Sequence, residues 1–166
     1  MSKAKLRTGI IGAGFSASFH IEAARRVYCA DVDVVGVHAK TRTSTESFAK
    51  KHGIQAFDDL DALLDGIDVL HICVPPALHE TVAVKALARG VFPIVEKPLT
   101  GYFGDGTENF DGREASMAQA RDGALDSIKR ILAAEAQSKA RVLYAENWVY
   151  APTVQKEREI LEKTKG

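Results

Sequence analysis

The sequence has no excess of charge of either sign, and this absence limits its partners. Its 166 residues include 22 Lys and Arg and 22 Asp and Glu, which gives a formal net charge of zero. A protein that coats nucleic acid, or that adheres to an anionic membrane, needs a basic excess to neutralise phosphate charge. We therefore expect no nucleic-acid partner and no membrane partner.

Cysteine is scarce, and a long apolar run is lacking. Cys29 and Cys73 lie far apart without the spacing of a metal or redox motif, so we interpret both as reduced thiols in a cytoplasmic core. No apolar run approaches the length of a membrane span, and no cleavable apolar block follows the basic start, so we expect no secretion signal. The histidines and carboxylates show no metal-ligand spacing, and we predict no metal site.

The sequence does contain a regular alternation of short apolar segments and amphipathic segments. Strand and helix in succession predict right-handed crossovers and an α/β fold, a doubly wound parallel sheet of the Rossmann type in three layers, α/β/α. The strands that we predict are Leu6–Ile11, Val32–Val37, Val69–Val74, Phe92–Val95 and Arg141–Ala145. The helices are expected after Gly14, from Thr43 (with Glu46 as a capping box) to Gly53, from Asp58 or Asp59 to Gly66, from Leu78 to Arg89, from about Ala115 to Gln137, and from Pro152 to about Lys163.

A glycine-rich segment interrupts this pattern between Gly101 and Gly112. Its glycines and acidic residues are typical of turns, and it predicts a loop. Two interpretations stay open: a lid or specificity loop in which Tyr102 and Phe103 reach a substrate, or a tolerated surface insertion. Gly123, in the helical pattern that follows, weakens the prediction of an unbroken helix.

The first strand leads into the pattern G-x-G-x-x-A at the start of an amphipathic helix. Gly12 would permit a tight turn, Gly14 would let a pyrophosphate touch the backbone, and Ala17 would allow close packing of helix on strand. The free amides of Phe15 and Ser16 would face the phosphates at the positive end of the helix. The alternative is a plain turn between strand and helix that needs glycine.

The end of the second strand bears on which dinucleotide binds. A site for NAD usually places a carboxylate there to accept from the ribose 2′-hydroxyl, but Asp31 and Asp33 lie at the beginning of this strand. Lys40 and Arg42 follow its end and could pair with a 2′-phosphate. We favour NADP over NAD, and the alternative is that these are solvated loop cations.

Two further segments carry a family resemblance: I-C-V-P-P-A-L-H at 72–79 and V-E-K-P-L at 95–99. Together with the glycine turn, they resemble the glucose–fructose oxidoreductase / inositol dehydrogenase (Gfo/Idh/MocA) family. The resemblance covers nearly all of the chain except the glycine-rich loop. Asn147 and the segment 148–152 look like the family's hinge into a second domain.

The resemblance implies an NAD(P)-dependent oxidoreductase that transfers a hydride between nicotinamide and a carbinol or carbonyl carbon of a sugar, polyol or related small molecule. It divides the chain into a dinucleotide-binding domain at 1–150, with a loop insertion at 101–112, and a hinge helix at 151–166. The family's second, α+β substrate domain would be absent, so we expect this chain alone to bind NADP(H) weakly and to turn over little or nothing. A homo-oligomer of the full-length form stays open, and so does a non-catalytic module that binds or senses NADP(H).

The resemblance also implies the residues of the site, with Lys97 as the catalytic residue. Carried over by position, they are Gly12, Gly14, Phe15 and Ser16 at the pyrophosphate, Lys40, Thr41 and Arg42 at the adenosine ribose, Val74, Pro75 and His79 along the path of the cofactor, and Glu96, Lys97, Asn147 and Trp148 near the nicotinamide. The family often has T-P-N where this chain has V-P-P at 74–76, so a side-chain amide contact is missing here.

The residues support this placement by their positions relative to the strands. Gly12, Lys40, Pro75 and Lys97 each follow the carboxyl end of a different predicted strand, and one cleft of a parallel sheet could gather all four. A lysine in such a cleft could exchange a proton with the reacting oxygen. The alternative for Glu96 and Lys97 is an exposed turn pair of little energetic value.

The histidines have a separate interpretation. His79 stands at a helix start, where it either contacts the cofactor or packs. His71, inside a strand, is expected to be a hydrogen-bonded core residue, and His20 is expected on the first helix in a surface or packing role.

Overall fold

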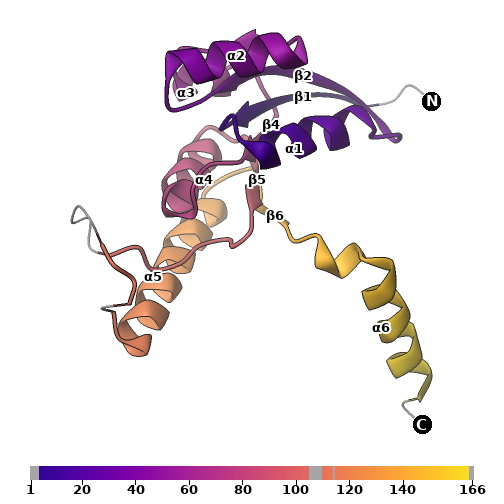
Figure 1. Ribbon diagram of the computed structural model, residues 1–166, viewed down its shortest axis with the longest axis vertical. Coiled ribbons are helices and arrows are strands. Elements are labelled where there is room, and N and C mark those ends of the chain that lie inside the picture. The colour runs from indigo at the N-terminus through magenta and orange to yellow at the C-terminus, as the bar shows by residue number, and fades with distance from the viewer. Residues whose placement is uncertain (1–3, 105–109, 114, 165–166) are drawn as a thin grey trace.

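The protein is described by a computed structural model that covers residues 4–104, 110–113 and 115–164. At its centre lies a six-stranded sheet of order β3-β2-β1-β4-β5-β6, in which every pair of neighbours is parallel (Figure 1). The strands are β1 (Ala4–Ile11), β2 (Ala30–His38), β3 (Gln55–Ala56), β4 (Val69–Ile72), β5 (Phe92–Glu96) and β6 (Leu143–Ala145). This order confirms the predicted doubly wound fold, since the chain reverses direction across the sheet after β3.

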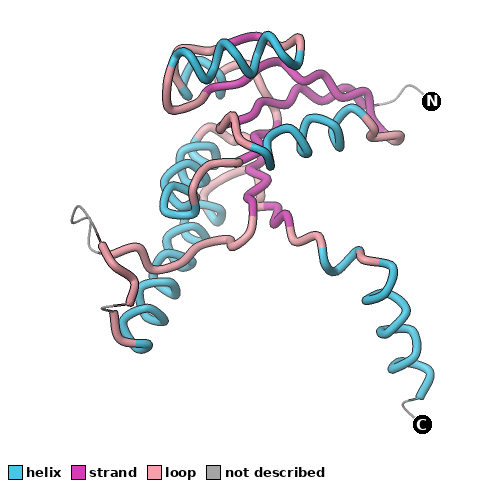
Figure 2. The backbone as a smooth tube through the Cα atoms, in the orientation of Figure 1, coloured by secondary structure: helices cyan, strands magenta, loops and turns pink. Residues whose placement is uncertain are grey.

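Helices connect the strands and cover the sheet on both faces. They are α1 (Phe15–Arg25), α2 (Arg42–His52), α3 (Leu60–Leu64), α4 (His79–Ala88), α5 (Met117–Ala136) and α6 (Pro152–Thr164), with short 3-10 turns at Pro76–Leu78 and Trp148–Tyr150. Figure 2 shows the same alternation of strand and helix along the chain. Within the described residues, no helix combines the length and apolar character that a membrane crossing requires.

Two buried clusters hold the layers together, one on each face of the sheet. Ile10 of β1 packs with Ile21 of α1 and Phe48 of α2, whereas its neighbour Ile11 packs with residues of α3 and α4. Adjacent residues of a strand point to opposite faces, so β1 contributes to both clusters. These clusters fix the start of α1 against the carboxyl ends of the central strands.

The helix boundaries correct two predictions from the sequence. The N-cap of α2 is Thr41, whose hydroxyl accepts from the amide of Ser44, and not Thr43 as the capping-box spacing indicated. Cys29 is exposed rather than in the core, because α1 ends at Arg25 and the connection to β2 runs over the surface.

Helix α5 is unbroken across Gly123, and the ring of Tyr102 explains the glycine. A Cβ at position 123 would lie 2.3 Å from a ring carbon of Tyr102. Tyr102 also contacts the ring of Phe110 at a centroid distance of 5.2 Å. The loop therefore packs Tyr102 against α5, which favours the surface-insertion interpretation for that residue; residues 105–109 lie outside the described part of the chain.

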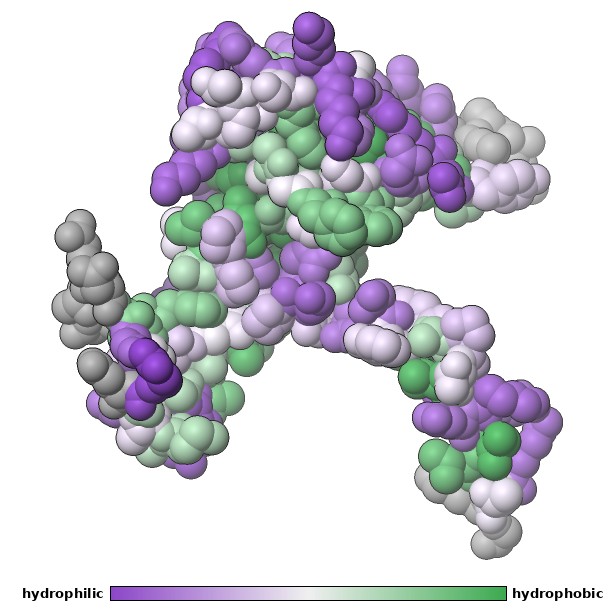
Figure 3. Space-filling view, in the orientation of Figure 1, coloured by the Kyte–Doolittle hydropathy of each residue, from purple (hydrophilic) through white to green (hydrophobic). Residues whose placement is uncertain are grey.

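Helix α6 extends away from the sheet and buries none of its residues (Figure 1). Ion pairs between neighbouring turns run along it, such as Arg158 with Glu162. The face of the molecule in Figure 3 is polar over α2 and apolar at its centre beside α1. Phe15 and Phe19 of α1 are exposed.

Candidate functional site

The predicted site residues gather along one edge of the sheet. They follow the carboxyl ends of β1, β2, β4, β5 and β6, and these ends lie together because the strands are parallel and in register. In open α/β sheets, ligands bind at this edge. The strand ends that precede Gly12, Lys40, Pro75 and Lys97 therefore lie on the same side of the sheet, but of these four residues only Lys97 lines either of the cavities described below.

The turn between β1 and α1 contains two glycines with different reasons for their presence. Gly12 has φ +104°, and a Cβ there would lie 2.2 Å from the carbonyl oxygen of Cys73. Its N–H donates to the carbonyl of His38 over 2.8 Å, so the turn is held tightly between β2 and β4. Gly14 has φ −89°, and a Cβ there would meet nothing within 4 Å. The fold itself requires a glycine at position 12 and not at position 14.

The start of α1 offers backbone donors at this turn. Gly14 is the N-cap and gives no side-chain hydrogen bond to the first turn of the helix. The first amides of a helix lack intrahelical partners and lie at its positive end, so those of Phe15 and Ser16 can bind an anion. Ala17 is fully buried against the sheet, as its place in the motif predicts. These residues fit a pyrophosphate: a bare backbone, open space and unused donors.

The loop after β2 contains Lys40, Thr41 and Arg42. The guanidinium of Arg42 forms ion pairs with Glu46 and Asp58, and Thr41 uses its hydroxyl to cap α2. Within the described part of the chain, Lys40 is exposed and has no carboxylate within ion-pair distance. Of the two predicted cations, Lys40 is therefore the one whose charge is not already shared with acidic neighbours.

His79 differs from its predicted role along the path of the cofactor. Its side chain is buried, with Nδ1 at 2.9 Å from the carbonyl oxygen of Pro98 and Nε2 at 2.9 Å from that of Val74. Because both ring nitrogens face backbone carbonyls, His79 joins the loops that follow β4 and β5. The structure favours the packing alternative for this residue. Val74 and Pro75 follow the carboxyl end of β4, at the edge of the sheet where the other candidate residues lie.

A cavity of about 750 Å³ opens beside the end of β5. It brings together five of the predicted residues, Phe15, Ser16, Glu96, Lys97 and Asn147. Trp148 follows Asn147 directly but does not line the cavity, and it is 70% exposed. The peptide bond between Lys97 and Pro98 is cis.

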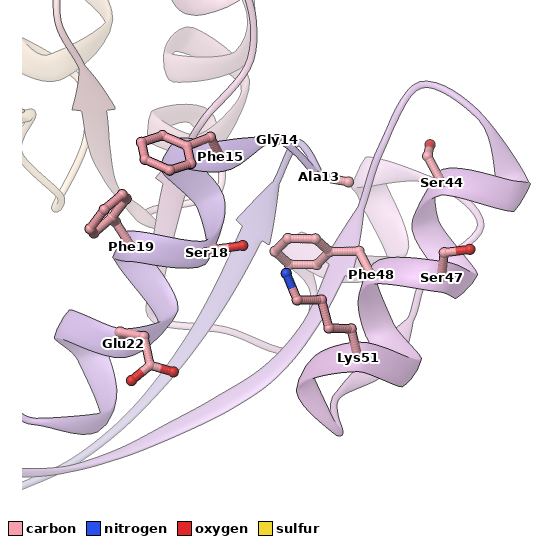
Figure 4. Close-up of a pocket in the computed structure, with 10 residues that line it drawn as sticks. All are labelled: Ala13, Gly14, Phe15, Ser18, Phe19, Glu22, Ser44, Ser47, Phe48 and Lys51. Atoms are coloured by element: carbon pink, nitrogen blue, oxygen red, sulfur yellow. The ribbon is translucent and has the colours of Figure 1, made fainter.

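A second cavity of about 670 Å³ lies between α1 and α2 and reaches Gly14 at one end (Figure 4). Ser18 of α1 and Phe48 and Lys51 of α2 face it from opposite sides. Its lining includes no residue of β5 and not Lys97, so it does not join the pyrophosphate turn to the predicted catalytic residue.

Cys73 lies under the glycine turn but is unsuited to nucleophilic chemistry. Burial raises the pKa of its thiol to about 12, a shift that a hydrogen bond with Ser16 only partly offsets. The group therefore stays a thiol at neutral pH, in agreement with the predicted core role.

The structure adds residues that the sequence did not indicate. The cavity beside β5 is also lined by His20, His71, Tyr144 and Tyr150. His71 is the hydrogen-bonded, buried residue that was expected. His20, for which a surface or packing role was expected, lines the cavity. The only local signal for His20 was its place on the first helix, six residues after Gly14, which does not show its distance from β5.

The fold and the site can be compared with known proteins. The family model for the oxidoreductase family Gfo/Idh/MocA, described as its NAD-binding Rossmann fold, matches residues 6–114. The UDP-N-acetylglucosamine 3-dehydrogenase of Acidithiobacillus ferrooxidans is 34% identical over 95 residues, which are 57% of this chain and 29% of that protein. An inositol 2-dehydrogenase of Arthrobacter sp. is 38% identical over 100 residues, again 57% of this chain and 29% of the relative. The chain thus spans about three tenths of the length of these curated relatives.

Solved structures share the fold at lower identity. The WlbA dehydrogenase of Bordetella pertussis, in complex with NADH and UDP-GlcNAcA, matches with a TM-score of 0.77 at 18% identity, over 98% of this chain and 41% of that one. KijD10, a 3-ketoreductase of Actinomadura kijaniata in complex with NADP, matches with a TM-score of 0.74 at 18% identity, over 97% of this chain and 45% of the other. The family model, the strand order and the glycine turn agree, and the chain belongs to the Gfo/Idh/MocA oxidoreductase family, of which it carries the NAD-binding Rossmann fold.

Proposed function

We propose that this chain binds NAD(P) with the pyrophosphate on the turn between β1 and α1, as the cofactor domain of a dehydrogenase or reductase. The observation that carries the proposal is Gly14, where a Cβ would meet no atom of the protein within 4 Å. The backbone there needs no glycine for its conformation or its packing, but a phosphate that approaches the main chain does.

Lys97 is the proposed catalytic residue of the whole protein. When bound, the nicotinamide gives or takes the hydride, and a proton must then be supplied to or removed from the substrate oxygen. Lys97 is exposed at the cavity beside β5, so its ammonium can hold that proton at the oxygen. Ser16, which lines the same cavity, lies in the first turn of the helix that would hold the phosphates, so both proposed functions border one space.

The proposed substrate is a small molecule with a secondary carbinol or carbonyl carbon, such as a sugar or polyol. Two relatives are named UDP-N-acetylglucosamine 3-dehydrogenase and inositol 2-dehydrogenase, and these names support a substrate of this kind. Substrate binding would need chain beyond these residues to exclude water, so we expect little or no turnover from this chain alone. Reduced thiols such as Cys73 suit the cytoplasmic location that we propose.

We propose NADP as the preferred cofactor and NAD as the alternative. Asp31 and Asp33 pair in register with Lys5 and Arg7 near the start of β1, at the opposite edge from Gly12. The strand-end loop therefore presents Lys40 to a 2′-phosphate, with Arg42 partly neutralised by its own ion pairs.

Calorimetric titration of the chain with NADPH and with NADH tests the proposal. We expect measurable and weak binding of NADPH, with NADH weaker; binding of neither would overturn the cofactor assignment. In the whole protein, Lys97→Ala should lose turnover and keep cofactor binding. Retained turnover in that variant would contradict the catalytic role, and a whole protein that binds NADPH without any turnover would instead be a sensing module.

A further inference from the structure

Three polar side chains form a hydrogen-bonded chain beneath the turn that carries Lys97. Nδ1 of His71 lies 2.8 Å from Nδ1 of His20, and Nε2 of His20 lies 3.1 Å from Oε1 of Glu96. The second carboxylate oxygen of Glu96 accepts from the backbone N–H of Lys97 over 2.9 Å. The two imidazole rings are nearly perpendicular, at 88°. This series of hydrogen bonds therefore ends at the backbone amide of Lys97, the proposed catalytic residue.

This hydrogen-bonded chain joins three elements of the fold. His71 comes from β4, His20 from α1 and Glu96 from the end of β5. His71 is buried, and the side chains of His20 and Glu96 are only 13% and 21% exposed. Polar groups with so little access to water are stabilised by fixed partners, and each of these groups has one. The position of the Lys97 turn is thereby tied to helix α1 and to the core of the sheet.

The acceptor chemistry of Glu96 fixes a proton on His20. An ionised carboxylate can only accept, so Nε2 of His20 must carry a hydrogen for the contact to be a hydrogen bond. One further hydrogen lies between the two Nδ1 atoms, from either ring. Burial, assisted by the nearby His20, lowers the pKa of His71 to about 4, so the imidazole of His71 is neutral at neutral pH. Among the described residues, no group of three or more ligating side chains could hold a metal ion.

We propose that His20 and His71 are positioning residues for Lys97: they orient the carboxylate of Glu96 so that it holds the Lys97 amide and sets where the lysine side chain leaves the turn. The inference rests on the proposed function, in which Lys97 meets the substrate oxygen. A misplaced general acid or base loses much of its effect, so residues that fix its position contribute to the activity of the site. We call the hydrogen-bonded set of His71, His20 and Glu96 the brace.

Nuclear magnetic resonance of the chain tests the brace directly. In the wild type, we expect imidazole ¹⁵N signals that report a protonated Nε2 on His20 and slow hydrogen exchange at the Lys97 amide. The His20→Ala substitution should raise the exchange rate of this amide about tenfold, because a hydrogen bond to a charged group loses its support. His20→Gln, whose side-chain amide can donate to Glu96, should restore most of the protection.

His52→Ala is the matched control, since His52 lies on α2 and contacts Ser18 rather than Glu96. An unchanged exchange rate in His20→Ala, or an equal rise in His52→Ala, would overturn the inference. So would an unprotonated Nε2 on His20 in the wild type. If His20→Ala does not fold, Glu96→Gln provides the second variant: its one amide oxygen stays with the Lys97 N–H and its NH2 group faces Nε2 of His20, so the signal of a protonated Nε2 should be lost. A retained signal of a protonated Nε2 would overturn the inference.

NADPH titration of the wild type, run in parallel, separates the two proposals. A chain that binds no NADPH but shows the protected Lys97 amide and the His20→Ala effect contradicts the proposed function and supports the brace. A chain that binds NADPH but shows no effect of His20→Ala on the amide contradicts the brace alone.

Discussion

At the scale of single residues, Gly12 and Gly14 in the turn between β1 and α1 have different roles: the fold requires Gly12, and the proposed binding of a pyrophosphate requires Gly14. Gly12 is required by its left-handed backbone and by the carbonyl of Cys73, whereas Gly14 has ordinary dihedral angles and open space around its missing side chain. A substitution at each position should therefore affect a different property of the chain.

Gly14→Ala should leave the thermal midpoint within a few degrees of the wild type and weaken NADPH binding at least about tenfold, because the added methyl occupies the space of a phosphate oxygen. Gly12→Ala should lower the midpoint strongly, because its Cβ collides with backbone. Calorimetric melts and NADPH titrations of both variants check this. Unchanged NADPH affinity in Gly14→Ala would contradict the placement of the pyrophosphate.

The buried imidazole of His71 should make folding pH-dependent. Burial lowers its pKa from 6.5 to about 4, so above pH 6.5 neither the folded nor the unfolded chain protonates it. As pH falls from 6.5 towards 4, only the unfolded chain binds the proton, and the free energy of unfolding should drop by up to about 3 kcal/mol. Urea unfolding at several pH values, for the wild type and His71→Gln, measures this. An equal pH dependence in both proteins would exclude His71 as the cause.

Sequence reasoning placed Gly14, Lys40 and Lys97 at turns that follow strands, because a local pattern is enough to predict such positions. It could not identify His20 as a partner of Glu96, because 76 positions separate them and their contact depends on how α1 packs against the sheet. The same limit applies to His79, whose carbonyl partners belong to two loops that meet only in the folded chain.

At the scale of elements, apolar periodicity predicted the strands and helices well, and local chemistry set the remaining boundaries. The five predicted strands are present, with ends that differ by a few residues, because buried parallel strands carry continuous apolar runs. Strand β3 was missed, since two residues, Gln55 and Ala56, give no periodic signal. The N-cap of α2 was misplaced by two positions because Thr41 and Thr43 are equally suited by type and only the folded backbone selects between them.

The contact between Gly123 of α5 and Tyr102 gives a prediction about an element. An exposed glycine inside a helix normally costs about 1 kcal/mol relative to alanine, so Gly123→Ala would be expected to stabilise α5. Here the new Cβ would lie 2.3 Å from the Tyr102 ring, and we expect no stabilisation in the wild type. In a Tyr102→Ala background, the same change should stabilise by up to about 1 kcal/mol.

Urea unfolding of the four proteins of this double-mutant cycle measures the coupling between the two positions. Equal stabilisation by Gly123→Ala in both backgrounds would show that the Tyr102 ring does not occupy this face of α5.

At the scale of the whole molecule, the parallel order brings the ends of five strands to one edge, and with them candidate site residues spread between positions 12 and 147. This convergence was predictable, because alternating strands and helices permit few arrangements. The separation into two cavities, one beside β5 and one between α1 and α2, was not predictable, since it depends on how side chains fill the spaces between layers.

The proposed preference for NADP over NAD depends on the charged residues that follow β2 at the carboxyl edge of the sheet. Lys40→Ala should weaken NADPH binding about tenfold and change NADH affinity little, because only NADPH carries the 2′-phosphate. Arg42→Ala should have a smaller effect, since Glu46 and Asp58 already share its charge. Titration of both variants with both nucleotides measures this. Equal losses for NADH and NADPH would contradict a 2′-phosphate contact.

The most direct measurement of the central claim follows the backbone amides of the wild-type chain by nuclear magnetic resonance while NADPH is added. The account predicts that the amides of Gly14, Phe15 and Ser16 show the largest and saturable shifts, because they would donate to the pyrophosphate. Shifts confined to other parts of the chain, with these three amides unmoved at saturation, would contradict it.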